Sequence, residues 1–117
     1  MARLTLEQKM SLIGGDDGMY IRAIPSIGLP HLRMSDGPVG VRTWGPSTAY
    51  TAGIALAASW DPELAKRVGR GLGEDARACG VKFLLGPGVN IYRAPMNGRN
   101  FEYFGEDPYL ASRITVG

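Results

Sequence analysis

The chain has 117 residues, of which 44% are hydrophobic and 21% charged, a balance typical of a single globular domain and not of a disordered segment. Its 13 basic and 11 acidic residues leave a net charge of +2, too small to indicate a nucleic-acid partner. No apolar run reaches the roughly 18 residues of a membrane helix. The N-terminus "MARLTLEQKM" lacks the apolar core of a signal peptide. We therefore expect a cytoplasmic protein as written, or a periplasmic or secreted one if a leader precedes it.

The sequence predicts neither a metal site nor a cofactor. Cys79 is the only cysteine and His31 the only histidine, so there is no disulfide within the chain and no metal-ligand spacing. "GRGLGE" at 69–74 lacks the glycine spacing of a dinucleotide loop and lies inside a predicted helix. Gly69 and Gly73, four residues apart, instead suggest a helix face that another backbone approaches closely.

Local end signals predict a short helix at each end of the chain. Thr5 and Gln8 have the spacing of a capping box, which predicts a helix over residues 6–13. Asp107 followed by Pro108 is a typical helix start, so a second helix is expected to run to the end of the sequence.

The central helix is predicted from its caps and its apolar spacing. Asp61 is a suitable N-cap, Pro62 suits the first helical position, and Gly80 is the expected stop. Apolar residues recur every fourth position and continue to Cys79: Leu64, Val68, Leu72 and Ala76.

Strands are predicted between these helices. Residues 31–34 and 81–85 read as strands, and the apolar run 53–59 as a buried strand or a turn of helix. Two prolines make residues 19–31 irregular. Taking 53–59 as a strand, the order is helix, strand, strand, helix, strand, helix, which indicates an α/β fold with a parallel sheet.

The polar loops follow the strands, whereas the connections from helices back into strands are short and carry no notable polar motif, as in a (β/α)₈ barrel. Such a barrel takes roughly 250 residues, whereas this chain supplies about three strand–helix units. We therefore expect residues 1–117 to be the N-terminal portion of a barrel domain that continues in a longer protein.

Asp36 follows a predicted strand in "SDGP". Its carboxylate can cap the turn by accepting hydrogen bonds from nearby backbone amides. Alternatively, an exposed carboxylate at a strand end can accept hydrogen bonds from two vicinal hydroxyls of a ligand.

The loop "RAPMNGRNFEYFGEDP" at 93–108 is unusually rich in charge and aromatic rings. Arg99 is either a brace paired with Glu102 or Glu106, or a fixed donor to a ligand oxygen. Arg93 is more readily explained as a brace to the same acids. Rings near these groups could be core or a sugar platform: Trp44, Phe101, Tyr103 and Phe104.

The motifs "RMSDGPVGVR" and "GRNFEYFGEDP", with the helix between them, resemble the N-terminal barrel domain of glycoside hydrolase family 3 and are most similar to its β-glucosidases. The resemblance implies a retaining hydrolase of β-glucosides or oligosaccharides, in which Asp36 and Arg99 bind hydroxyls of the sugar in the −1 subsite. Arg93 and Glu102 then have secondary, loop-bracing roles. Alternatives are a β-xylosidase-type specificity, or a truncated, non-catalytic sugar-binding module.

The resemblance also implies what this chain lacks. The family's Lys-His pair, its nucleophilic Asp and its acid/base Glu all lie beyond the position that matches Gly117, so no catalytic residue is assigned in this chain. We expect the chain alone to be inactive and to act together with the remainder of the barrel and the C-terminal domains.

Overall fold

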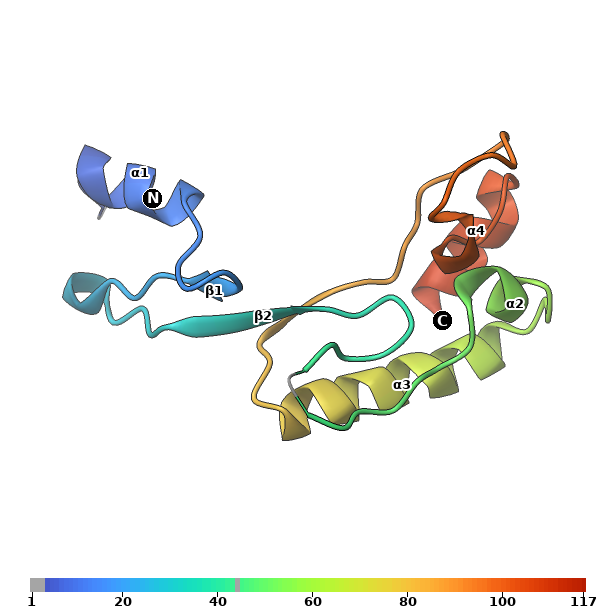
Figure 1. Cartoon of the computed structure of the whole chain (residues 1–117), viewed down its shortest axis with the longest axis horizontal. Helices are drawn as coiled ribbons and strands as arrows, with labels where there is room; N and C mark the ends of the chain where they lie inside the picture. The colour runs from blue at the N-terminus through green and yellow to red at the C-terminus, as the bar shows by residue number, and fades with distance from the viewer. Residues whose placement is uncertain (1–3, 44) are drawn as a thin grey trace.

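The computed structural model describes residues 4–43 and 45–117. Its elements are α1 (Leu6–Ile13), β1 (Tyr20–Ile21), the 3₁₀ turn η1 (Pro25–Ile27), β2 (Leu32–Asp36), α2 (Gly53–Ala57), α3 (Pro62–Ala78), β3 (Phe83–Leu85), the 3₁₀ turn η2 (Asn100–Glu102) and α4 (Pro108–Val116). The molecule is elongated, with extents of 47 × 30 × 25 Å. Figure 1 shows α1 and α4 at opposite ends, with β2 and α3 between them.

The predicted helix ends are confirmed. The Thr5 hydroxyl accepts from the backbone amide of Gln8 at 3.2 Å, and Oε1 of Gln8 accepts from the Thr5 amide at 3.0 Å. The carboxylates of Asp61 and Asp107 each accept from two amides of the first turn that follows. Gly80 ends α3 with a positive φ of 71°, a conformation that glycine adopts without steric cost.

The sheet has the order β1-β2-β3 and mixes two pairing directions. β2 and β3 pair in parallel, as predicted, with Asp36 opposite Leu85. β1 pairs antiparallel with β2, placing Tyr20 opposite Arg33. The prediction that residues 19–31 are irregular throughout was therefore wrong. The two-residue strand β1 forms only through its hydrogen bonds with β2, and no pattern within residues 19–31 predicts it.

Of the two alternatives for residues 53–59, the turn of helix is confirmed, because Gly53–Ala57 forms α2; the strand counted there in the predicted order was wrong. Leu56 and Ala57 are buried with Phe104 and Ile114 in one hydrophobic cluster, against which α3 also packs. Because the neighbours of these two residues are mostly on helices, burying one face of a helix is more favourable at this position than adding a strand to the sheet. The described chain consequently has two strand–helix units joined by a parallel pair, not about three.

A second, smaller cluster lies under the parallel pair, where Val41, Ala76 and Val81 are buried and contact Cys79 and Leu84. Much of the remaining apolar surface is exposed. The accessible area is 8134 Å², against roughly 6,200 Å² for a compact domain of this size. The radius of gyration is 16.8 Å, against about 13 Å for a compact chain. The fold therefore leaves surface that a closed domain would bury.

Candidate functional site

The site begins at the carboxyl edge of the parallel pair. Asp36 is the last residue of β2, and Leu85, its partner in register, is the last residue of β3. The amide of Gly37 donates to the Leu85 carbonyl at 3.1 Å. A Cβ built at Gly86 would lie 2.9 Å from the carbonyl carbon of Gly37, so the two exits touch backbone to backbone. Both polar loops therefore leave from one place on the sheet.

The carboxylate of Asp36 faces outward at this edge. Its side chain is 51% exposed, and Nη1 of Arg42 lies 3.5 Å from Oδ2. The Arg42 amide also donates to the Asp36 carbonyl at 3.0 Å. Among the described residues, no backbone amide donates to the Asp36 carboxylate, so it does not cap the turn. Arg42 was missed by the sequence interpretation; its only signal was its place at the end of "SDGPVGVR".

Arg99 and Glu102 form an ion pair through Nε and Oε1. They are three residues apart on the turn that contains η2, and side chains at that spacing in a 3₁₀ turn lie one above the other. The pKa of Arg99 is raised, first by the hydrogen bond with Glu102, then by that carboxylate's charge, and more weakly by the charge of Asp36. The two predicted sugar-binding residues thus lie within electrostatic reach of each other.

Arg93 has a different environment. It is exposed, and in the described part of the chain it makes no ion pair with Glu102 or Glu106. Of the two carboxylates expected to accept Arg93, Glu102 is paired with Arg99 instead, because the 3₁₀ spacing brings Arg99 to Glu102 locally. The proposed brace through Arg93 is therefore absent from the described residues.

Backbone and amide contacts order the rest of the loop. Nδ2 of Asn97 donates to Oδ1 of Asn100 at 2.7 Å, and Nδ2 of Asn100 donates to the Ala94 carbonyl at 2.9 Å. A parallel bridge joins Gly88 to Tyr103. These asparagines were not singled out from the sequence, although Asn side chains in a loop commonly stabilise turns.

The rings of the loop separate into two roles. Phe104 is 5% exposed and belongs to the hydrophobic cluster, so it is core. Phe101 is 51% exposed. Tyr103 is half-buried, with its ring 6.3 Å from that of Tyr92. Trp44 lies outside the described residues. Phe101 is thus the ring of this loop that is available to a ligand.

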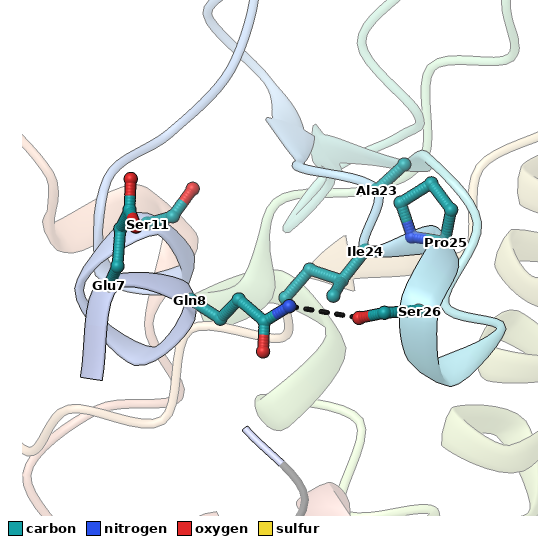
Figure 2. A pocket seen from close by; sticks show the side chains of 7 residues that line it. All are labelled: Glu7, Gln8, Ser11, Ala23, Ile24, Pro25 and Ser26. Atoms are coloured by element: carbon teal, nitrogen blue, oxygen red, sulfur yellow. Dashed lines mark hydrogen bonds between the residues drawn. The ribbon is translucent and has the colours of Figure 1, made fainter. Parts of the chain in front are cut away.

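A cleft of about 320 Å³ lies elsewhere, between α1 and residues 23–26. Figure 2 shows Gln8 crossing it to donate to the Ser26 hydroxyl at 2.9 Å. This cleft is at the end of the molecule opposite the 93–108 loop (Figure 1). It contains none of the predicted sugar-binding residues, and the polar contact across it serves to hold α1.

Two further properties concern the described residues only. No three side chains of His, Cys, Asp or Glu gather there in an arrangement that could hold a metal ion. Of the helices in residues 4–43 and 45–117, none combines the length and apolar character needed to cross a membrane.

The described fold and site define a class: a mixed α/β protein in which polar loops leave the carboxyl ends of neighbouring parallel strands. The family model of the glycosyl hydrolase family 3 N terminal domain matches residues 19–117. The chain therefore belongs to glycosyl hydrolase family 3, which confirms the resemblance found in the sequence.

Its relatives are much longer proteins. The β-glucosidase BoGH3A of Bacteroides ovatus is 49% identical over 97% of this chain, which spans 17% of that enzyme. The exo-α-(1→6)-L-arabinopyranosidase of Bifidobacterium longum is 40% identical, with the same two coverages of 97% and 17%. The crystal structure of a β-glucosidase from Kluyveromyces marxianus in complex with glucose matches 97% of this chain and 14% of its own, with 35% identity and a TM-score of 0.89. The chain spans about a sixth of the curated relatives it matches.

Proposed function

We propose that this chain is the first part of the (β/α)₈ barrel of a retaining glycoside hydrolase that releases terminal β-linked glucose. One observation carries the proposal: Asp36 ends β2 directly opposite Leu85, the last residue of β3, and Arg99 lies on the loop that leaves β3 from that same edge. The β-glucosidases among its relatives support the choice of reaction and of sugar.

The two residues have complementary chemistry toward a sugar. The Asp36 carboxylate can accept hydrogen bonds from two neighbouring hydroxyls, because its two oxygens are acceptors only when ionised. The Arg99 guanidinium can donate to a further hydroxyl from a fixed planar geometry. Retaining hydrolysis also needs two carboxyl groups roughly 5–5.5 Å apart, one as nucleophile and one as acid and base. We assign neither to this chain, which in this proposal contributes sugar binding.

Besides the sugar, the proposal includes a second partner: the remaining part of the barrel, which would cover the exposed apolar surface of this chain. β3 is an edge of the described sheet, and its Phe83 and Leu85 are each about half exposed. Parallel strands are normally covered on both faces and paired on both edges. A largely apolar cleft of about 190 Å³ beside Val68, Leu72 and Phe104 is a second surface of this kind. Further strand–helix units of the same protein would cover it.

A pentopyranoside is the second candidate substrate. The Bifidobacterium longum relative is named for an L-arabinopyranosyl residue, and a β-xyloside is the corresponding alternative among β-linked sugars. Xylose differs from glucose by lacking the group at C6, and L-arabinopyranose differs also in the configuration at C4. The space around C6 and the contacts to the 4-hydroxyl therefore decide the specificity.

A chimera tests the proposal. Residues 1–117 would replace the matching segment of the Bacteroides ovatus β-glucosidase, and kcat/KM would be measured on aryl glycosides of β-D-glucose, β-D-xylose and α-L-arabinopyranose. We expect β-glucoside hydrolysis within about tenfold of the unaltered enzyme, equivalent to roughly 1.4 kcal/mol. A folded chimera that hydrolyses none of the three contradicts the proposal, and preference for a pentoside selects the second candidate. A stop codon directly after the codon for Gly117 would favour a binding module without activity.

A further inference from the structure

We infer that Glu102 is the positioning residue for Arg99: its buried carboxylate holds the guanidinium Nε, so that the two terminal nitrogens are presented to a ligand at the Asp36 edge. The inference rests on the proposed function for the ligand's chemistry. It assigns to Glu102 a role in ligand binding that it performs through another residue.

Burial shows which member of the pair is fixed. The Glu102 side chain is 7% exposed, whereas that of Arg99 is 71% exposed. An ionised carboxylate removed from water is costly unless it is paired, so Glu102 needs a cation. An exposed arginine would otherwise sample many rotamers. The buried carboxylate therefore orients the exposed guanidinium, and not the reverse.

Two glycines set the position of Glu102 itself. A Cβ built at Gly53, the first residue of α2, would lie 2.6 Å from the Glu102 carbonyl oxygen, and one built at Gly88, just beyond β3, would also lie 2.6 Å from it. Both positions must be glycine for these segments to approach so closely. The backbone of Glu102, from which the carboxylate extends, is therefore held against α2 and against the exit of β3.

The N–H donors of Arg99 fall into two groups, one bound to Glu102 and the others open to a ligand. Nε is used by Glu102. Within residues 4–43 and 45–117, no hydrogen bond uses Nη1 or Nη2 of Arg99. A guanidinium has five N–H donors in one plane, so the hydrogen bond at Nε restricts the directions in which the other four point. Asp36 lies at the end of the strand that pairs with β3, whose loop carries Arg99, so an acceptor and a set of donors belong to the two loops that leave one edge of the sheet.

Chemical rescue in the chimera separates positioning from bracing. Arg99→Ala should lower kcat/KM for an aryl β-glucoside on the order of 10²-fold, because hydrogen bonds from a charged donor are lost. Guanidinium chloride at about 50 mM should then restore at least roughly tenfold, because Glu102 can hold the free cation in place of the side chain. In Arg99→Ala/Glu102→Gln the restoration should disappear. The matched control is Arg99→Ala/Glu106→Gln, which removes an exposed carboxylate from the same loop and should keep the restoration.

Each outcome is decisive. Restoration that persists in Arg99→Ala/Glu102→Gln, or that never occurs in Arg99→Ala, overturns the inference. If Arg99→Ala/Glu102→Gln does not fold, Arg99→Ala/Glu102→Asp takes its place. Because the aspartate side chain is shorter, a several-fold higher guanidinium concentration should be needed for the same restoration of kcat/KM. An unchanged guanidinium concentration overturns the inference. Failure of the proposed function looks different, because the unmodified folded chimera is then inactive before any substitution is made.

Discussion

The Tyr50 hydroxyl donates a hydrogen bond of 2.9 Å to Oδ2 of Asp75, 25 residues further along the chain. Tyr50 belongs to the loop that follows Asp36, and Asp75 belongs to α3. The Tyr50 amide also donates to the Val39 carbonyl at 2.9 Å. The loop that leaves β2 after Asp36 is thus fastened to the long helix α3.

This contact predicts a pH-dependent stability. The pKa of Tyr50 is raised above 10.0, first by burial and then by the hydrogen bond to Asp75. The folded protein therefore holds this proton more tightly than the unfolded chain, and the resulting stabilisation is complete below the unfolded pKa and lost as the pH rises through the folded one. In the chimera, Tyr50→Phe should lower Tm at neutral pH, and its difference from the parent should shrink above about pH 10. A difference that stays constant from about pH 7 to 11 would show that Tyr50 contributes only by packing.

Two glycines of α3 should respond oppositely to alanine. A Cβ at Gly71 would lie 2.7 Å from the Tyr50 hydroxyl, so Gly71→Ala should displace that hydroxyl from Asp75 and lower Tm. A Cβ at Gly73 meets nothing within 4 Å, so Gly73→Ala should stabilise the helix by roughly 0.5–1 kcal/mol. Thermal unfolding of both variants in the chimera checks this. The sequence had suggested a close backbone approach at Gly69 and Gly73, and no described residue approaches either within 4 Å. Destabilisation by Gly73→Ala would mean that a further part of the full-length protein does.

The isolated 117-residue chain should lack a cooperative thermal transition as a monomer. Its accessible area of 8134 Å² exceeds that of a compact domain, and apolar side chains on α1 and β3 are exposed. Small cores leave little net stability after chain entropy is counted. Circular dichroism on heating, with a sizing column, provides the measurement. A sharp melt above about 50 °C from a monomer would contradict the prediction.

The isolated chain should not hydrolyse an aryl β-glucoside. Retention needs two carboxyl groups on opposite sides of the scissile bond, and the proposed function assigns neither of them to this chain. Release of the aryl group is the measurement, after removal of contaminating host glucosidase. Turnover that is lost on changing an acid of this chain would show that the assignment is wrong.

In the chimera, Asp36→Ala should be far more damaging to activity than Arg93→Lys. Losing two charge-assisted hydrogen bonds to hydroxyls should cost on the order of 10²- to 10⁴-fold in kcat/KM. Arg93 is exposed and keeps its charge as lysine, so kcat/KM should change by less than about threefold, as for exposed sites away from a ligand.

A deoxy-substrate sharpens this comparison. A glucoside without the hydroxyls that Asp36 binds should react almost equally with the parent chimera and with Asp36→Ala, because the substitution then removes a contact that the substrate does not make. If Asp36→Ala remains folded and loses less than about tenfold on the full glucoside, Asp36 does not bind the sugar.

Local chemistry in the sequence was enough to determine the helix ends. Thr5 with Gln8, Asp61 and Asp107 act on amides within three residues, and Gly80 supplies a backbone conformation by itself. Such interactions depend on neighbours in the chain, so their spacing predicts them. Membership of the family could also be inferred from the sequence, because each of its motifs is a continuous stretch of residues, and the family model confirms it.

Partners distant in the chain were decided only by the tertiary structure. Residues 53–57 are too short for their period to distinguish helix from strand, and burial of Leu56 and Ala57 against other elements made them helical. β1 exists because Tyr20 and Ile21 meet β2, which no local signal reports. The choice among the arginines was decided by the folded loops: the 3₁₀ turn brings Arg99 and not Arg93 to Glu102, and the loop after β2 brings Arg42 to Asp36. Charge and side-chain type define which pairs are possible, whereas distance in the folded chain selects among them.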